Sequence, residues 1–279
     1  KKPGMPVSNF ARLLASRGAQ AVGATVAAGT FAASGVAYAN DNVLHAPAYP
    51  WSFNGFFNAY DAASIRRGHQ VYTQICATCH SLNRIAFRNL VDVCYTEDEA
   101  KALAMDVEVT DGPNDTGEMF ERPGKLADYL PAPYPNEAAA RYSNGGAYPP
   151  DLSLIVKARH GGPDYIFALL TGYKTPPAGV GARETQWYNP YFAGGWIGMP
   201  PPLDEDGAVD YFDGTPSTIT QMAKDVSYFL QWASEPEHDD RKLMGFKWIV
   251  AMTIALGFTT YYKRFKWSAL KTRRLEFEN

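Results

Sequence analysis

The sequence predicts a mainly α-helical protein that ends in a transmembrane helix. Apolar residues recur at helical spacing after Asp61 and again after Ser217, and the segments between these positions are rich in proline and glycine. Near the C-terminus, residues 243–262 form an apolar run with a single charge. Because the net charge is only −3 and no basic stripe interleaved with aromatics occurs, a nucleic-acid-binding protein is excluded.

Residues 1–40 have the pattern of a targeting segment. Residues 18–40 carry no charge and end in Ala37-Tyr38-Ala39-Asn40, which resembles a site for a signal protease. Two interpretations stay open: the segment is removed after targeting, or it is retained and residues 19–39 cross the membrane as a weak second span. The charges of the segment are all positive: Lys1, Lys2, Arg12 and Arg17.

Residues 41–240 are expected to form the globular domain. Its first helix begins at Asp61, a favourable N-cap, and continues directly into Cys76. Its last helix begins at Ser217, again a favourable N-cap, and ends near Ser234, ahead of a proline. The last helix carries a regular apolar stripe, so we expect that stripe to be buried in the core.

Between these two helices most of the chain is expected to be irregular. Residues 92–150 contain proline and glycine throughout, with one short helix at 96–105. A further helix is predicted at 163–171, and residues 173–216 form a loop dominated by glycine, proline and tyrosine. The result is a helical domain with long loop insertions.

The C-terminal apolar run predicts a membrane anchor. At about 1.5 Å per residue, residues 243–262 just span the roughly 30 Å hydrocarbon core, and Lys247 is close enough to one end to reach the interface. A charged linker, residues 235–242, precedes the run, and the basic tail 263–279 follows it. The alternative, a buried core helix, does not explain the basic flank. The excess of Lys and Arg places the tail on the positive side of the membrane and the globular domain on the other.

The segment Cys76-Ala77-Thr78-Cys79-His80 has the spacing of a covalent haem attachment site. Two thiols three positions apart at a helix end can each form a thioether with one macrocycle, and the imidazole that follows can ligate its iron. The alternative is a zinc or thioredoxin-like site, but the sequence lacks a second ligand pair at metal spacing. The motif therefore predicts one covalent haem c and a protein that transfers electrons.

Met199 is the strongest candidate for the sixth ligand of the iron. It lies in the segment 196–202, where three prolines restrict the backbone and Gly198 permits a close approach. A thioether opposite an imidazole favours ferrous iron and raises the reduction potential. His69 is the competing ligand, but it lies too near His80 on the same helix to reach the opposite face of the haem.

Together these motifs identify the sequence as similar to the cytochrome c1 family. The similarity covers about residues 45–275, and the sequence departs from the family in residues 1–40 and at Cys94, for which a free thiol and a redox role are both open. The matching segments are Cys76-Ala77-Thr78-Cys79-His80-Ser81, Phe87-Arg88-Asn89-Leu90, Asp111-Gly112-Pro113, Arg122-Pro123-Gly124-Lys125-Leu126, Pro149-Pro150-Asp151-Leu152-Ser153, Lys157-Ala158-Arg159-His160-Gly161-Gly162, Asn189-Pro190-Tyr191-Phe192, Gly198-Met199, Asp213-Gly214-Thr215-Pro216 and Trp232-Ala233-Ser234-Glu235-Pro236-Glu237-His238.

The resemblance implies a class I cytochrome c fold with long loop insertions and one C-terminal transmembrane helix. It also implies that Arg159 pairs with a haem propionate, a role that suits a guanidinium fork. From the residues alone, an ordinary surface ion pair is the alternative for Arg159. The resemblance assigns haem-binding roles to the following residues: Cys76, Cys79, His80, Met199, Arg159, Tyr165 and Asn144.

The resemblance further implies a place in the respiratory chain. Members of this family take electrons from a Rieske iron–sulfur protein and pass them to soluble cytochrome c, within a dimeric ubiquinol–cytochrome c oxidoreductase (bc1) complex that contains cytochrome b. The expected location is the mitochondrial inner membrane, with the haem domain in the intermembrane space and the C-terminus in the matrix. Such a subunit performs no bond chemistry, so no catalytic acid, base or nucleophile is expected.

Residues 92–121 are strongly acidic, with ten carboxylates against Lys101 alone. One interpretation is an ordinary solvated face. The other is a negative field that steers a basic partner such as cytochrome c and raises its encounter rate. The resemblance adds a third element, an acidic hinge subunit that covers this region.

Two other functions fit parts of the pattern. A haem peroxidase or gas-binding cytochrome would need an open position on the iron, which a firmly held Met199 denies. A purely structural subunit with a vestigial haem would not need an intact attachment motif. Electron transfer accounts for both the firmly held Met199 and the intact haem attachment motif.

Overall fold

The computed structural model describes residues 44–181 and 183–276. The targeting segment or second span expected within residues 1–40 lies outside the described residues. The described residues are mainly helical, and the expected fold class, a helical domain followed by a long apolar C-terminal helix, is confirmed.

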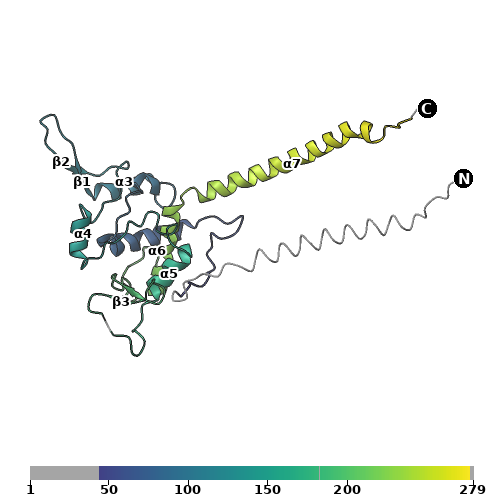
Figure 1. Ribbon diagram of the computed structural model, residues 1–279. Coiled ribbons are helices and arrows are strands. Elements are labelled where there is room, and N and C mark those ends of the chain that lie inside the picture. The colour runs from purple at the N-terminus through teal and green to yellow at the C-terminus, as the bar shows by residue number, and fades with distance from the viewer. Residues whose placement is uncertain (1–43, 182, 277–279) are drawn as a thin grey trace. The chain divides into compact units, whose positions relative to one another are not determined.

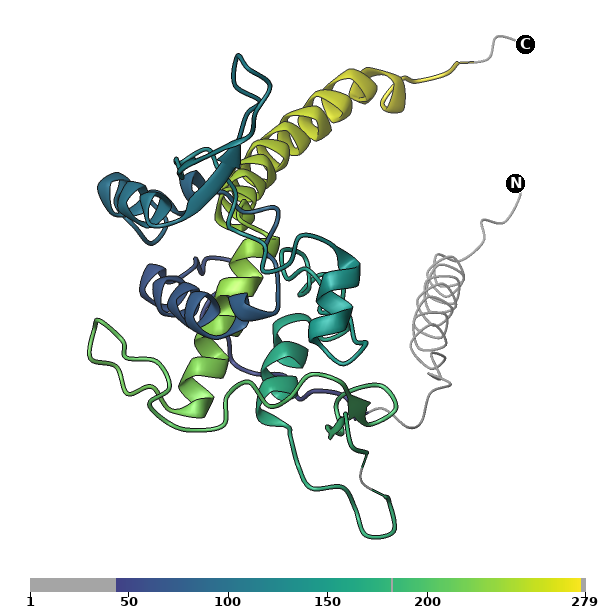
Figure 2. The same cartoon turned by 90° about the vertical axis from the view of Figure 1, so that its left-hand side faces the viewer.

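The centre of the domain is the contact between α2 (Ala62–Gln74) and α6 (Ile219–Ser234). Figure 2 shows these two helices side by side, in dark blue and light green. Their backbones approach closely at Gly68, where an added Cβ would lie 2.0 Å from the carbonyl oxygen of Asp225. No side chain larger than hydrogen fits there, so a glycine is required at the crossing.

Both central helices begin at side-chain caps. The Asp61 carboxylate accepts hydrogen bonds from the backbone N–H groups of Ala63 and Ser64, as predicted. The predicted cap of α6 is wrong by one residue, because the Thr218 hydroxyl, and not Ser217, accepts from the backbone N–H of Gln221. Serine and threonine cap equally by chemistry, and only the backbone angle decides between neighbours.

Short elements occupy the region 92–150, which was expected to be irregular apart from one helix. That helix is confirmed as α3 (Glu97–Met105), with Thr96 as its cap. The structure adds an antiparallel hairpin of β1 (Glu108–Asp111) and β2 (Phe120–Pro123), and a seven-residue helix, α4 (Glu137–Ser143). These elements are short and largely exposed, so they leave little apolar periodicity in the sequence.

The second half of the domain contains α5 (Gly162–Thr171), within one residue of the prediction. The long loop that follows is interrupted by a two-residue ladder of β3 (Trp187–Tyr188) with β4 (Trp196–Ile197). Helix α5 packs against α6. The loop between α5 and α6 therefore starts and ends on two helices that pack against each other.

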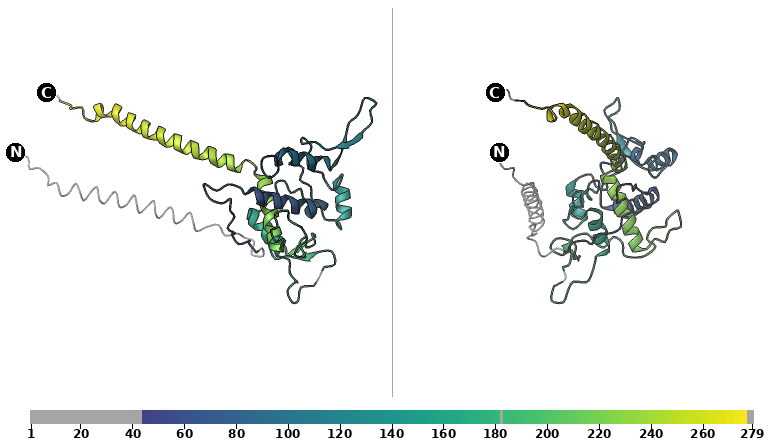
Figure 3. Two further views of the ribbon diagram at one scale, coloured as in Figure 1. Left: turned by 180° about the vertical axis from the view of Figure 1, so that it is seen from behind. Right: turned by 90° about the vertical axis from the view of Figure 1, so that its right-hand side faces the viewer.

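The C-terminal helix α7 (His238–Lys271) is longer than the predicted span at both ends. Residues 238–242, expected to be a linker, form its first turn because the buried His238 ring lies 4.6 Å from the Tyr60 ring and holds the chain on the domain. Figure 1 shows α7 continuing away from the domain, and Figure 3 shows α6 leading into it. Among the described residues it is the one helix long and apolar enough to cross a bilayer.

Candidate functional site

The motif at the end of α2 forms a tight turn. Residues Cys76–Thr78 make a 3-10 turn, and the carbonyl oxygen of Cys76 accepts from the backbone N–H groups of Cys79 (3.2 Å) and His80 (2.9 Å). Both cysteines are free and half-buried. The turn therefore places two thiols and an imidazole within a single fold of the backbone, immediately after the helix.

Burial keeps the first of these thiols protonated. Burial, together with the smaller effect of the neighbouring Cys79, raises the pKa of Cys76 to about 12. A neutral thiol needs no charged partner in an apolar setting, and none is found within the part of the chain that the structure describes. Cys76 is thus a protonated thiol at neutral pH.

The orientation of the His80 imidazole is fixed by a backbone carbonyl. Its Nδ1 lies 2.8 Å from the carbonyl oxygen of Pro150. Because a carbonyl oxygen can only accept, Nδ1 must carry the proton, which leaves the lone pair on Nε2. Burial also lowers the pKa of His80 and favours the neutral ring. This is the arrangement of a metal-ligating histidine with its second nitrogen held by an acceptor.

The segment that supplies this carbonyl is itself fastened to the motif. The Leu152 N–H donates to the carbonyl oxygen of Ser81 (2.9 Å), and the Asp151 carboxylate accepts from the Ser81 hydroxyl (2.9 Å) and from the Asn83 N–H (2.8 Å). These bonds fix Pro150 relative to His80. Sequence reasoning missed this role of Pro150, because every residue carries a carbonyl and nothing in the sequence distinguishes one that faces a histidine.

The loop that carries Met199 is braced from two sides. The Tyr173 hydroxyl donates to the carbonyl oxygen of Met199 at 3.1 Å. A Cβ added to Gly198 would lie 3.1 Å from the Cβ of Ala147, three residues before Pro150. The Met199 loop therefore approaches the chain segment that orients His80. The expected close approach of Gly198 to the haem ring stays a prediction, and the contact that the structure gives is with Ala147.

Arg159 and Tyr165 form a group that extends to the same loop. Burial raises the pKa of Tyr165, and the charge and hydrogen bond of Arg159 oppose that rise. Burial also raises the pKa of Tyr173, and the nearby Tyr165 contributes a smaller part of that rise. The Arg159 guanidinium is exposed and also donates to the carbonyl oxygen of Ala158 at 3.1 Å. Within the described residues Arg159 has no carboxylate partner, so the surface ion pair considered as its alternative is not formed.

Asn144 has a different environment from the other expected site residues. Its side-chain amide donates to the Tyr134 hydroxyl (3.1 Å) and to the carbonyl oxygen of Ala140 (2.7 Å). Asn144 is also the C-cap of α4. Its side-chain nitrogen and its backbone N–H thus help to fix the end of that helix.

The other residues that the sequence singled out are buried or half-buried: His69, Cys94 and Met222. The Nε2 of His69 is buried and has no hydrogen-bond partner among the described residues. His69 is buried, and its Nδ1 lies 3.0 Å from the Tyr95 hydroxyl. Burial raises the pKa of Cys94 to about 12, which leaves a protonated, poorly nucleophilic thiol at neutral pH and gives no support to a redox role. Met222 lies in the core, as expected from the apolar stripe of α6.

The residues of the site fit a covalently bound haem. Cys76 and Cys79 would hold it through thioethers, and His80 and Met199 would ligate its iron. When bound, the haem supplies a one-electron redox centre. A zinc site would need further ligands, and among the described residues no group of three or more His, Cys, Asp or Glu is placed so that it could hold a metal ion.

The acidic run 92–121 is partly neutralised within the domain. Glu99 pairs with Arg66 at 2.8 Å, and Glu97 pairs with Lys101 at 2.8 Å. Arg122 binds two carboxylates, Asp111 at 2.5 Å and Asp128 at 2.7 Å. Several carboxylates of the run are exposed and have no such partner among the described residues: Asp106, Glu108, Asp115, Glu118 and Glu121.

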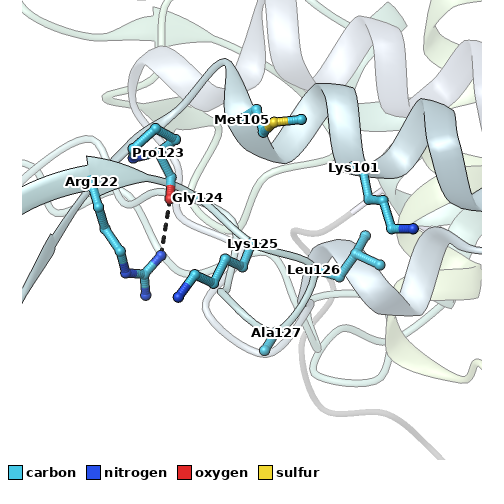
Figure 4. A pocket seen from close by; sticks show the side chains of 8 residues that line it. All are labelled: Lys101, Met105, Arg122, Pro123, Gly124, Lys125, Leu126 and Ala127. Carbon is cyan, nitrogen blue, oxygen red and sulfur yellow. Dashed lines mark hydrogen bonds between the residues drawn. The ribbon is translucent and has the colours of Figure 1, made fainter.

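A groove also lies in this region, between α3 and residues 122–127. Figure 4 shows Met105 and Leu126 among its lining side chains, with Lys101 and Lys125 beside them. None of the expected haem-binding residues lines it. The groove therefore belongs to the acidic insertion and not to the haem site.

Comparison with known proteins identifies the family of the chain. The model of the cytochrome C1 family matches residues 51–270. Over 232 residues the chain is 62% identical to "Cytochrome c1 1, heme protein, mitochondrial" of Arabidopsis thaliana, covering 83% of this chain and 75% of the relative. It is 59% identical over 241 residues to "Cytochrome b-c1 complex catalytic subunit, mitochondrial" of Candida albicans, covering 86% and 83%. Cytochrome c1 of Saccharomyces cerevisiae is 55% identical over 240 residues, covering 86% and 77%. The chain therefore belongs to the cytochrome c1 family.

Proposed function

We propose that this protein is the membrane-anchored haem subunit of a mitochondrial bc1 complex and that it transfers electrons. The observation that carries the proposal is the hydrogen bond between His80 Nδ1 and the carbonyl oxygen of Pro150, which puts the proton on Nδ1 and leaves the lone pair on Nε2. The name of the Candida albicans relative supports the assignment to a bc1 complex. In this role the subunit takes electrons from the Rieske iron–sulfur protein and gives them to soluble cytochrome c.

The proposed cofactor is a single haem c, attached through Cys76 and Cys79 and ligated by His80 and Met199. A thioether ligand stabilises ferrous iron and so raises the reduction potential, as suits a donor to cytochrome c. Two contacts hold the backbone of the loop that carries Met199: the hydrogen bond from the Tyr173 hydroxyl and the approach of Gly198 to Ala147. A ligand held in this way closes the sixth position to exogenous gases.

Arg159 and Tyr165 are proposed to receive a haem propionate. The Arg159 guanidinium is exposed and has no carboxylate partner among residues 44–181 and 183–276, so its charge is available to an anion. Tyr165 lies close enough to the Arg159 guanidinium for its charge to lower the pKa of the Tyr165 hydroxyl against the rise that burial causes. Asn144 is proposed to act less directly, by fixing the end of α4 near the haem.

The arrangement in the membrane follows from α7 and its flanks. Residues 243–262 are proposed to span the mitochondrial inner membrane, with the basic tail 263–279 in the matrix and the haem domain, within residues 41–240, in the intermembrane space. Residues 1–40 are proposed as a targeting segment. The proposed neighbours are cytochrome b and an acidic hinge subunit in a dimeric complex.

A potentiometric titration of the purified haem-loaded chain, followed through its visible haem bands, tests the proposal. Carbon monoxide is then added to the reduced form. We expect one high-potential centre that does not bind carbon monoxide. A low potential together with carbon monoxide binding would mean an open or displaced sixth position, and would favour a gas-binding or peroxidase function instead.

A further inference from the structure

The first turns of α7 are tied to the loop that precedes α2. The Lys242 ammonium donates three hydrogen bonds, to the carbonyl oxygens of Phe53 (2.7 Å), Gly55 (2.8 Å) and Asn58 (2.9 Å). An ammonium has three protons, and all three are used here on one loop. Lys242 therefore binds both ends and the middle of the loop 53–58 and holds it against the start of α7.

A second set of contacts reinforces this tie. The Asp239 carboxylate accepts from the backbone N–H of Tyr60 at 3.0 Å. The buried His238 ring lies 6.2 Å from the Phe53 ring and 4.6 Å from the Tyr60 ring. The loop 53–58 and its flanking residue Tyr60 are thus joined to α7 by both polar and aromatic contacts.

At its tip the loop presents two aromatic side chains to solvent. Phe56 is 53% exposed and Phe57 is 81% exposed. Their rings lie 4.9 Å apart, and both contact Phe246 of α7, at 6.2 and 5.8 Å. Phe246 follows Lys242 by one helical turn, about 6 Å along the axis. The pair therefore lies at the level where the apolar run 243–262 begins.

An aqueous surface is a poor environment for this pair. Apolar area left in water is unfavourable, and these two exposed phenylalanines contact each other and Phe246 of α7. The headgroup boundary of a bilayer is the region that α7 enters at this level, and aromatic side chains concentrate there. Lys242 occupies three carbonyl oxygens of the loop, which removes part of the cost of placing its backbone at such a boundary.

We propose that the Phe56–Phe57 loop is a second membrane contact, inserted into the interfacial region of the phospholipid bilayer beside α7. Lys242 and Asp239 hold it against the helix, so that the haem domain is fixed at one height above the membrane. This inference rests on the proposed crossing of the membrane by residues 243–262. The occupant of the surface is lipid, and coverage by another protein subunit is an outcome that the test distinguishes.

The test uses the full haem-loaded chain in phospholipid nanodiscs, with the haem reduced. A nitroxide is attached at Phe57→Cys in a Cys94→Ser background, and its accessibility to oxygen is compared with that to a water-soluble nickel chelate. Phe212→Cys is the matched control, since Phe212 is an 85% exposed phenylalanine on a loop of the globular domain. Leu256→Cys, on the exposed surface of α7, is the reference for the bilayer interior.

The expected ratio of oxygen to nickel accessibility at position 57 lies above that at 212 and below that at 256. A ratio at 57 equal to that at 212, with a high ratio at 256, overturns the loop proposal and leaves the membrane span intact. A low ratio at 256 overturns the span itself. The Phe57 label is also measured in the purified complex, where an immobile label shielded from both reagents would mean that protein covers the loop and would overturn the lipid assignment.

A second variant tests the clamp. Lys242→Met keeps an unbranched side chain and removes the three donors. We expect greater mobility of the label at 57 and a shift of its depth, with no change at 256. An unchanged mobility and depth at 57 would show that Lys242 does not hold the loop.

Discussion

The hydroxyl of Tyr173 donates a hydrogen bond of 3.1 Å to the carbonyl oxygen of Met199. Tyr173 reaches this position because the chain turns at Gly172, where an added Cβ would lie 2.4 Å from the carbonyl oxygen of Ala168. The end of α5 is thereby connected to the loop that carries the proposed axial ligand. Replacement of residues on this connection should alter the ligation of the iron without touching the metal.

The first prediction concerns that hydrogen bond. Tyr173→Phe removes the donor and should destabilise the loop by about 1 kcal/mol, the usual net value of one such bond. The sixth ligand should then dissociate more often, so the reduced protein should bind carbon monoxide slowly but measurably. Tyr188→Phe is the control, because no hydrogen bond of that hydroxyl is found within the described residues. Equal carbon monoxide binding by both variants would remove the special role of Tyr173.

Replacement of the proposed ligand itself should have a larger effect. Met199→Leu keeps the volume but removes the thioether, so the potential should fall by on the order of 0.1 V or more, within the roughly 0.8 V range that axial ligands control. The reduced form should bind carbon monoxide readily. Met105→Leu, at an exposed position of α3, should change neither property. An unaltered potential in Met199→Leu would show that another residue ligates the iron.

Steering by the acidic run is tested through its dependence on salt. Neutralising Asp106, Glu108 and Glu121, which are exposed and lack an ion-pair partner among the described residues, should slow the reduction of cytochrome c at low ionic strength. The difference from the unmodified complex should disappear as added salt shortens the screening length to about 8 Å and below.

The control for this experiment neutralises the same number of carboxylates elsewhere: Glu184, Glu237 and Asp240. It should leave the rate of cytochrome c reduction close to that of the unmodified complex at every ionic strength. Equal slowing by the two triple variants, or slowing that is independent of salt, would argue for an ordinary solvated face.

His69 should make stability depend on pH. Burial, together with the charge of Arg66, lowers the pKa of His69 from 6.5 to about 4. Below pH 6.5 the unfolded chain binds a proton that the folded protein does not, so stability falls as the pH drops towards 4. The loss amounts to at most about 3 kcal/mol.

Unfolding of the haem-loaded protein by denaturant at several pH values between about 7 and 4.5 measures this slope. In His69→Gln the slope over this interval should be smaller, since the titrating group is gone. His160→Gln removes an exposed histidine and serves as the control. A slope that is the same in His69→Gln and in the unmodified protein would contradict the assignment.

Much of this protein follows from the sequence alone. The haem motif, the helices that begin after Asp61 and Thr96, the helix at 162–171 and the apolar C-terminal segment each have a local signal: a fixed spacing, a cap or a periodicity. Such signals survive without knowledge of the fold, because they depend on residues close together in the chain. The exposed hairpin β1–β2 and helix α4 have no comparable signal and were missed.

What only the tertiary structure decided is which distant groups meet. Pro150 faces His80 across 70 positions of the chain, Tyr173 supports Met199 across 26, and Lys242 encloses a loop nearly 190 residues earlier. Each of these contacts uses a backbone carbonyl, which every residue possesses. The amino-acid type therefore carries no mark of the partner, and only the packing of α2, α5 and α6 determines which carbonyl each side chain reaches.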